Sequence, residues 1–257
     1  MKIFRDLNFQ HAEERPVALT IGYFDGIHRG HQWVLNSLKT VAKEHAQKTA
    51  VITFENHPAE VLLPSKKIQN LITMEHKIKL FEEHRIDYLI ILKFTKELAE
   101  MTAEDFLKAI SNPLPFSQLV LGHDAVFGKG KDGTKERVRD LGLKHHFNVE
   151  YLEPFKIENM VASSTLIRNF LQSGNLQMVE KLLGRPYSIY GQFYSHDNDF
   201  IFDYSGIFLL PEGNYKVKLK DQHSLKVNII EIRDQKIYLK NYSSLNNFFE
   251  IFFDSYQ

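Results

Sequence analysis

Two histidines, His28 and His31, stand three residues apart in the stretch GYFDGIHRGHQ, which covers residues 22–32. An imidazole can donate a hydrogen bond to a phosphate oxygen, transfer a proton or bind a metal ion. The spacing of three with no third ligand nearby disfavours a metal site. Two loop histidines that are merely solvated are the other simple interpretation. The elements around the pair decide between these possibilities.

The two histidines lie at a predicted strand-to-helix turn. Residues 17–21 form a short apolar run bounded by Pro16 and Gly22, which is typical of a buried strand. The turn pair Asp25-Gly26 follows, and apolar residues then recur at helical spacing. In open α/β sheets, such a helix N-terminus offers free N–H groups and a partial positive charge to an anion. The pattern therefore predicts a phosphate site.

Composition excludes several other classes of function. Lys and Arg total 32 residues, as do Asp and Glu, so no overall positive charge favours nucleic acid or anionic lipid. The absence of cysteine excludes disulfides, thiolate metal sites and a cysteine nucleophile. The N-terminus is too polar for a secretory signal, and no apolar stretch approaches the roughly 20 residues that span a bilayer. We expect a cytoplasmic protein, monomeric or weakly oligomeric, without nucleic-acid or membrane partners.

Short β-branched runs alternate with amphipathic segments through about residue 155, which predicts an α/β domain with a doubly wound parallel sheet. The expected strands are residues 17–21, 50–54, 88–92, 118–121 and 149–152. The expected helices are residues 31–45, 73–86, 95–111, 134–144, 164–172 and 176–183. Beyond Pro186 an alternating pattern predicts strands, with Tyr215, Val217 and Leu219 on one face. The expected domains are 1–185 and 186–257, and residues 246–253 fit either a strand or a helix.

Four ordered blocks of the sequence resemble one enzyme family. Residues 22–31 resemble the HxGH signature of the nucleotidylyltransferase superfamily. More narrowly, they resemble G-N-F-D-G-V-H-x-G-H in the FMN adenylyltransferase module of bacterial bifunctional riboflavin kinase/FAD synthetases, with Tyr23 in place of Asn. The other blocks resemble T-F-[DE]-P-H-P-x-x-V-L at 53–62, G-x-D-F-x-F-G at 122–128, and S-S-T-x-I-R with G-R-P-Y at 163–168 and 184–187. Asn56 replaces a proline, and Ala125 replaces an aromatic residue.

This resemblance implies a Rossmann-like HxGH nucleotidylyltransferase domain followed by a small C-terminal β-barrel-like domain. It implies FAD synthetase activity, in which AMP passes from ATP to FMN and pyrophosphate leaves, with Mg²⁺ bound through the ATP phosphates. The catalytic residues implied are His28, His31 and Arg168, and no residue is expected to bind a metal directly. The residues implied in binding the substrates ATP and FMN are Gly22, Phe24, Asp25, Gly26, Gly30, Asn56, His57, Asp124, Phe127, Ser163, Ser164 and Thr165.

The residues themselves leave several roles open. Ser163-Ser164-Thr165 fits a capped helix start, and with Arg168 one turn along it also fits a clamp for a polyphosphate. Asp124 suits either ribose hydroxyls or the turn that follows it. Asn56 and His57 suit either the substrate or a polar turn before proline.

The second domain lacks the kinase signature of this family. Its sequence G-R-x-x-G-x-P-T-A-N does not occur after Tyr187, and only about 70 residues follow Pro186. We therefore expect a monofunctional FAD synthetase with a degenerate barrel and no kinase activity. Two alternatives stay open: another nucleotidylyltransferase of the same fold, and a flavin or nucleotide sensor that binds without turnover.

Overall fold

The computed structural model describes residues 1–9, 15–63, 65, 68–196, 199–202, 206–208, 210–220, 224–239 and 248–254. The chain forms two compact units. The first unit consists of Met1–Phe24, Gly30–Ile68 and Phe81–Phe155, and the second of Asp25–Arg29, Gln69–Leu80 and Lys156–Gln257. The domain division at residue 185, which rests on composition, stays a prediction.

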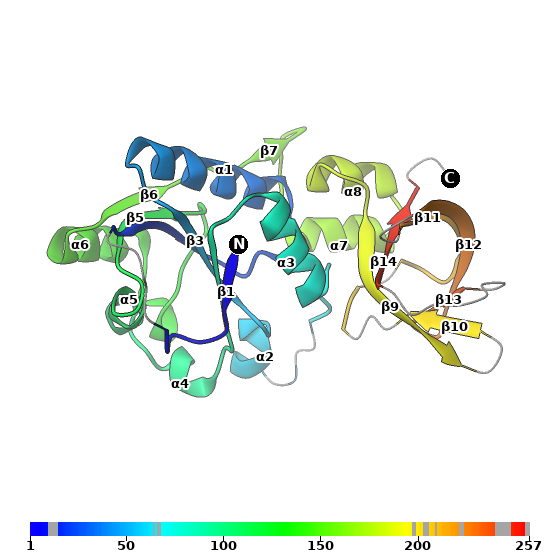
Figure 1. The fold of residues 1–257 in the computed structure, drawn as a ribbon, viewed down its shortest axis with the longest axis horizontal. Helices are drawn as coiled ribbons and strands as arrows, with labels where there is room; N and C mark the ends of the chain where they lie inside the picture. Colours follow the sequence, from blue (N-terminus) through cyan, green and yellow to red (C-terminus); the bar gives the residue numbers. More distant parts are fainter. Residues whose placement is uncertain are drawn as a thin grey trace. The chain divides into compact units, whose positions relative to one another are not determined.

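The first unit contains a six-stranded parallel sheet with strand order β1-β4-β3-β2-β5-β6, drawn in Figure 1. The strands are β1 Lys2–Phe4, β2 Val17–Ile21, β3 Thr49–Phe54, β4 Tyr88–Leu92, β5 Phe116–Leu121 and β6 Asn148–Tyr151. This sheet confirms the doubly wound α/β fold, and every predicted strand is present within two residues. The additional strand β1 escaped prediction because its three residues are too few to form a pattern.

Six α-helices begin within the described part of the first 150 residues. They are α1 Arg29–Glu44, α2 Pro58–Leu62, α3 Met74–Glu83, α4 Lys96–Ala99, α5 Ala103–Ser111 and α6 Lys135–His145. The helix predicted over 95–111 is wrong as one element, because Thr102 starts a new helix by accepting a hydrogen bond from the N–H of Asp105. Since parallel strands are joined by right-handed connections, α1 covers one face of the sheet and α5 and α6 cover the other (Figure 1).

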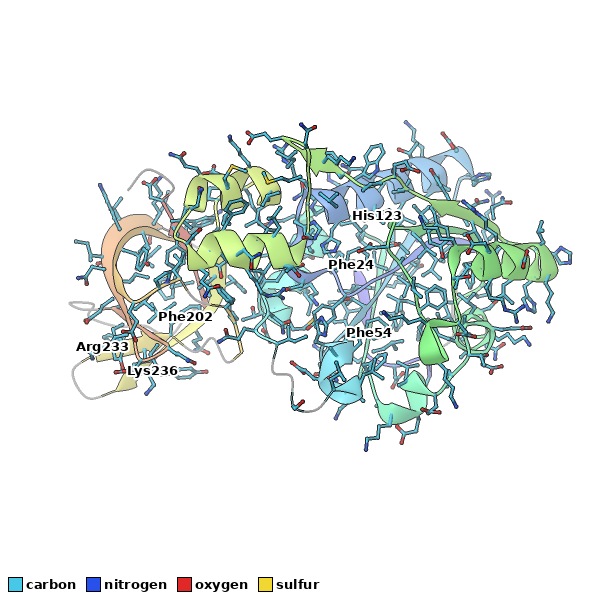
Figure 2. The ribbon with its side chains drawn as sticks, turned by 180° about the vertical axis from the view of Figure 1, so that it is seen from behind. Phe24, Phe54, His123, Phe202, Arg233 and Lys236 are labelled. Carbon is cyan, nitrogen blue, oxygen red and sulfur yellow. The ribbon has the colours of Figure 1, made fainter. Side chains whose placement is uncertain are left out.

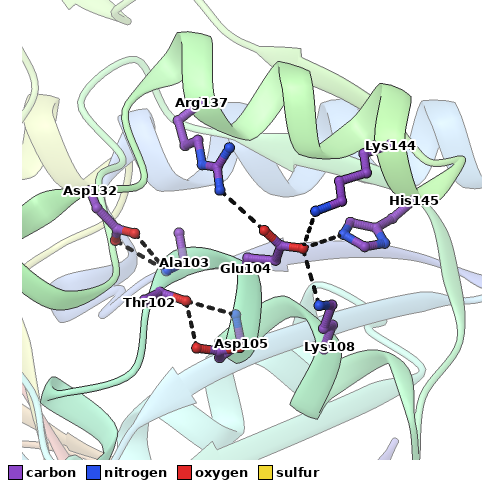
Figure 3. A network of polar contacts seen from close by, with 9 residues as sticks. All are labelled: Thr102, Ala103, Glu104, Asp105, Lys108, Asp132, Arg137, Lys144 and His145. Atoms are coloured by element: carbon purple, nitrogen blue, oxygen red, sulfur yellow. Dashed lines mark hydrogen bonds and ion pairs between the residues drawn. The ribbon is translucent and has the colours of Figure 1, made fainter.

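Glu104 fastens α5 to α6, as Figure 3 shows. Its carboxylate lies 2.7 to 3.1 Å from four cationic or imidazole groups, those of Lys108, Arg137, Lys144 and His145. Hydrogen bonds from Lys144, Lys108 and His145 lower the pKa of Glu104 to about 2. The carboxylate is therefore charged at neutral pH, and it holds the two helices on their face of the sheet.

The second unit contains a closed antiparallel barrel with strand order β10-β13-β12-β11-β14-β9. The strands are β9 Ser188–His196, β10 Asp199–Phe202, β11 Gly213–Lys220, β12 Leu225–Arg233, β13 Lys236–Leu239 and β14 Phe248–Phe253. This barrel confirms the predicted C-terminal β-barrel. Residues 248–253 form a strand rather than a helix, and residues 246 and 247 lie outside the described part. Inside the barrel, Val217 and Leu219 are buried, as their alternation predicts.

Before the barrel, the second unit holds a hairpin and two helices. The hairpin pairs β7 Lys156–Ile157 with β8 Met160–Val161, and the helices are α7 Ser164–Gln172 and α8 Leu176–Leu183. Both helices match their predicted ranges. Asn175 caps α8 at its start, and Gly184 ends it with a left-handed φ of 71°, a conformation that glycine adopts without strain.

The first turns of α3 are fixed to the barrel by Glu250 of β14. This carboxylate accepts hydrogen bonds from Lys79 at 2.9 Å and from Ser188 at 2.8 Å, and it lies 3.4 Å from the ring of His76. Burial raises the pKa of Glu250, but the bonds from His76 and Lys79 outweigh that effect and bring the pKa to about 2. A charged glutamate thus anchors residues 74–80 of α3, the part of this helix in the second unit, onto the barrel.

The chain adopts three left-handed backbone conformations in the HxGH segment. Phe24, Gly26 and Ile27 have φ values of 55°, 79° and 38°. Glycine adopts this conformation readily, whereas a β-branched residue such as Ile27 is strained there. A side chain at position 26 would also meet Leu71, since an added Cβ would lie 2.8 Å from its Cδ1. Only glycine fits this position without a shift of its neighbour.

We predict that Gly26→Ala lowers the free energy of unfolding by about 2 kcal/mol, because it adds a steric contact to a left-handed backbone. Gly174→Ala is the matched control, since Gly174 has a φ of 71° and nothing within 4 Å of an added Cβ. Urea unfolding of both variants would measure the difference. Equal destabilisation of the two variants would contradict the role of Leu71.

Candidate active site

The strand order of the first unit reverses at β2, which lies between β3 and β5. In open α/β sheets, ligands bind beyond the carboxyl ends of the strands at such a reversal. β2 and β3 are buried along their whole length, so only the residues that follow them can reach a ligand. Three predicted site residues lie beyond such carboxyl ends: Gly22 follows β2, Asn56 follows β3 and Asp124 follows β5. Phe94 likewise follows β4.

Gly22, Phe24 and His31 lie together in the first unit. The Phe24 ring packs edge-on against the ring of His31, with centroids 5.1 Å apart, and against Phe81 at 5.5 Å. A Cβ on Gly22 would lie 3.0 Å from the Phe24 ring, so glycine leaves room for this ring to fold back. Phe24 thereby fixes the orientation of His31 in the first turn of α1, beside Gly30.

Asn56 and His57 bind the backbone around them. The Asn56 amide donates to the carbonyl oxygen of Phe94 at 3.0 Å and accepts from its N–H at 2.9 Å, so it joins the ends of β3 and β4. The Nδ1 atom of His57 accepts from the N–H of Ala59 at 3.0 Å and caps α2. These contacts are those of a polar turn. A role of either side chain in substrate binding stays a prediction.

Asp124 and Phe127 follow β5 but lie in different surroundings. The Asp124 side chain is 82% exposed, and its nearest ionic partner is His123 at 3.7 Å. Phe127 packs against Phe106 with ring centroids 5.9 Å apart, on the core of the first unit. Asp124 is thus accessible to a ligand, whereas Phe127 supports the loop.

Asp25 and Arg168 form an ion pair in the second unit. Their Oδ2 and Nη2 atoms lie 2.5 Å apart, and Asp25 is only 3% exposed. The other carboxylate oxygen of Asp25 accepts from the N–H of Leu71 at 2.8 Å. Arg168 also donates through Nε to the carbonyl oxygen of Gln69 at 2.8 Å. The guanidinium predicted to grip phosphate is therefore engaged by protein groups, and its contact with a substrate stays a prediction.

Lys77 is a second cation beside Asp25, and the sequence did not single it out. It is 3% exposed, and burial lowers its pKa to about 8 against the opposing effect of Asp25. Burial also raises the pKa of Asp25, and the positive charges of Arg168 and Lys77 act in the opposite direction. One buried carboxylate thus interacts with a buried lysine and with a partly exposed arginine.

The three hydroxyl residues at the start of α7 have different environments. Ser163 caps the helix by accepting from the N–H of Leu166, which confirms the predicted capped start. Ser164 donates to the carbonyl oxygen of Asp25 at 2.9 Å, so it holds the HxGH turn. Thr165 is exposed. Ser164 and Arg168 therefore both contact Asp25, and the clamp for a polyphosphate stays a prediction.

His28 is a buried and neutral histidine. It is 5% exposed, and burial together with the positive charge of Arg185 lowers its pKa to about 4. Arg185 donates to the carbonyl oxygen of Gly26 at 2.8 Å and to that of Ile27 at 3.4 Å. The L-G-R-P-Y block gave no separate role to Arg185. The contacts of Arg185 with Gly26 and Ile27 join residues that are 159 and 158 positions apart, so no local pattern indicated them.

A doubly wound sheet whose central strand runs into a glycine turn and a helix N-terminus defines the α/β class in which phosphate groups bind at that turn. Comparison with known proteins narrows the class. The sequence profile of the FAD synthetase family matches residues 10–166. The chain belongs to the FAD synthetase family.

Several curated relatives are similar over most of the chain. The Haemophilus influenzae bifunctional riboflavin kinase/FMN adenylyltransferase is 34% identical, over 75% of this chain and 63% of its own. The protein of the same name from Buchnera aphidicola subsp. Acyrthosiphon pisum is 32% identical, over 86% and 73%. The FAD synthetase of Listeria monocytogenes is 30% identical, over 89% and 94%. The chain thus spans about three fifths of the length of several bifunctional relatives.

A solved structure shares the fold. The protein named macrolide-efflux protein from Streptococcus pneumoniae has a TM-score of 0.82 and 20% identity, over 98% of this chain and 88% of its own. Likeness at this identity shows the fold alone. Within the described part of this chain, no helix has both the length and the apolarity to cross a bilayer.

We predict that the His28 ring titrates at about pH 4 in the folded protein, well below the ordinary value of 6.5. Since the unfolded chain then takes up the proton first, the free energy of unfolding falls as pH drops from 6.5 toward 4. Histidine NMR titration would measure the pKa. A His28 pKa above 6 would contradict the neutral ring.

We predict that Asp25→Ala lowers the free energy of unfolding by about 3 to 5 kcal/mol, because it leaves Lys77 buried without its carboxylate and removes the ion-pair partner of Arg168. Glu158→Ala is the control, since Glu158 pairs with Lys181 at 2.7 Å with both side chains more than half exposed. This control is expected to cost less than about 1 kcal/mol. Chemical denaturation of both variants measures the two costs, and similar values would contradict the buried network.

Proposed function

We propose that this protein is an FAD synthetase that transfers AMP from ATP to FMN and releases pyrophosphate. The observation that carries the proposal is the family match over residues 10–166, which includes the HxGH turn after the central strand. The Listeria relative named FAD synthetase supports it, because the similarity covers 94% of that protein. The four blocks of sequence lie in the same order as in the family.

The chemistry needs no protein base. The phosphate of FMN is a phosphomonoester whose second pKa is about 6, so it is a dianionic nucleophile at neutral pH. It attacks the α-phosphorus of ATP in line, and the bond to the pyrophosphate group breaks. Catalysis then depends on positioning the two phosphates and on stabilising charge at the reacting phosphorus.

The HxGH turn supplies the groups for this stabilisation. His28 is neutral, so its ring has one N–H to donate, and we assign that donor to an oxygen of the α-phosphate. His31 lies in the first turn of α1, where the helix N-terminus favours negative charge. We assign His31 to the oxygen that bridges the α- and β-phosphates.

The remaining predicted residues fit supporting roles. The exposed Thr165 and the N-terminus of α7 suit the β- and γ-phosphates, while Arg168 holds Asp25. Gly22 and Gly30 leave space for the backbone to approach ATP, and exposed Asp124 suits its ribose. Mg²⁺ enters with ATP, bound through the phosphates. Among the described residues, no group of three His, Asp or Glu side chains is placed to hold a metal ion.

We further propose that the protein is monofunctional. The barrel persists, but the sequence lacks the P-T-A-N signature of the family's kinase module. Similarity over 94% of a protein named only FAD synthetase supports this interpretation. The barrel then has a structural role, which includes anchoring α3 through Glu250.

The test is FAD formation by the purified protein from FMN, ATP and Mg²⁺, with pyrophosphate release measured in parallel. Nicotinamide mononucleotide in place of FMN tests the alternative of another nucleotidylyltransferase. Binding of FMN or ATP without pyrophosphate release would favour the sensor. Riboflavin with ATP tests the kinase, and FMN formed in that reaction would contradict the monofunctional interpretation.

We predict that His28→Ala and His31→Ala each lower kcat at least about 100-fold, a loss typical of one transition-state donor. His45→Ala is the matched control, because His45 is exposed just beyond the end of α1. Steady-state FAD formation measures all three variants. Activity of either HxGH variant within threefold of the control would remove that histidine from the mechanism.

A further inference from the structure

Side chains of the second unit hold three successive carbonyl groups of the HxGH turn. Ser164 donates to the carbonyl oxygen of Asp25 at 2.9 Å. Arg185 donates through Nη2 to that of Gly26 at 2.8 Å and through Nη1 to that of Ile27 at 3.4 Å. One guanidinium therefore binds two successive peptide groups, the one between Gly26 and Ile27 and the one between Ile27 and His28.

The direction of these carbonyls sets the direction of the neighbouring N–H groups. A trans peptide is planar, and its C=O and N–H bonds point in opposite directions. The chain contains no cis peptide bond among the described residues. Since the carbonyls of Gly26 and Ile27 point at Arg185, the N–H groups of Ile27 and His28 point away from it. Successive N–H groups aimed in one direction are a common means of binding an anion.

We propose that Arg185 is a positioning residue, which holds the turn that carries His28 by donating from one guanidinium to the carbonyl oxygens of Gly26 and Ile27. This inference rests on the proposed function, in which His28 contacts the α-phosphate. It assigns to the G-R-P-Y block a task in adenylyl transfer that is separate from joining the two parts of the chain. Arg185 itself touches protein, not the reacting atoms.

The backbone at this turn needs such a support. Gly26 and Ile27 have φ values of 79° and 38°, and the conformation of Ile27 is strained. A strained residue persists where its surroundings hold it, and Arg185 binds both carbonyl groups at this point. The planar fork of arginine reaches two acceptors at once, whereas the ammonium of lysine is a single compact charge. Lysine at this position would therefore keep the charge and lose the two-point contact.

Arg185 has a second, separable effect on His28. Its positive charge acts with burial to keep the ring neutral. Loss of the charge would raise the pKa of His28, whereas loss of the fork alone would leave the pKa low. The charge and the two-point contact of Arg185 can therefore be removed separately. A residue that only fills space would show neither effect on the turn or on His28.

The test compares Arg185→Lys and Arg185→Met with the wild-type protein. Arg233→Met is the matched control, because Arg233 lies on the barrel at the β12–β13 turn, as Figure 2 shows, and its side chain is 49% exposed. The readouts are kcat and KM for ATP in FAD formation, and the His28 pKa and the amide resonances of residues 26–28 by NMR. Far-UV circular dichroism and thermal unfolding check that each variant folds.

We predict that both Arg185 variants lower kcat at least about tenfold, since small misplacements of catalytic groups are costly, while KM for ATP changes less than about threefold. The His28 pKa rises in Arg185→Met and stays near its wild-type value in Arg185→Lys. In both variants, the amide resonances of residues 26–28 shift. Arg233→Met leaves all four readouts unchanged.

Two kinetic outcomes would overturn the proposal. Full kcat in Arg185→Lys would show that charge alone suffices, and a rise of KM for ATP with unchanged kcat would indicate direct contact with phosphate. If the wild-type protein forms no FAD, the proposed function fails, but the NMR readouts still decide the role of Arg185. Unshifted resonances of residues 26–28 in both folded variants would then refute it.

Discussion

The buried carboxylate of Asp25 is the group on which the order of the HxGH turn depends. It pairs with Arg168 of α7, lies beside Lys77 of α3, and accepts a hydrogen bond from the backbone at Leu71. Removing ions from water is costly, and such a cluster is stable only when every charge and hydrogen-bonding group is satisfied. The cluster therefore has one favourable arrangement. The same turn contains left-handed backbone conformations at Gly26 and Ile27.

Much of the fold could be predicted from sequence because the signals are local. Buried strands such as β2 and β4 are continuous apolar runs, and a serine cap marks the first turn of α7. The elements that escaped have weak local signals. β1 has three residues, and α2 has no buried face, so its one strong mark is the cap at His57. Thr102 splits a continuous helical pattern because a cap outweighed the periodicity there.

The partners of charged residues were harder to predict. Sequence placed Arg168 one turn after the serines, but it could not show that Asp25, 143 residues earlier, lies against it. His76 and Lys77 precede Leu80 and Phe81 by four residues, so the helical spacing places them on the buried face of α3. Polar residues on an apolar face indicate a buried partner, whose identity depends on the tertiary fold. The candidate site was thus predictable as a set of residues, and less so as a set of contacts.

The residues 25–29 and 69–80 belong to the same compact unit as the barrel, although they lie far from it in the sequence. Tyr187 and Glu250 both bind this early part of the chain, through the carbonyl of Leu71 and through Lys79. A chain shortened after residue 185 would therefore lose the contacts that hold residues 69–80 to the barrel. Within the second unit, the barrel therefore has contacts that depend on its strands and not on any kinase chemistry.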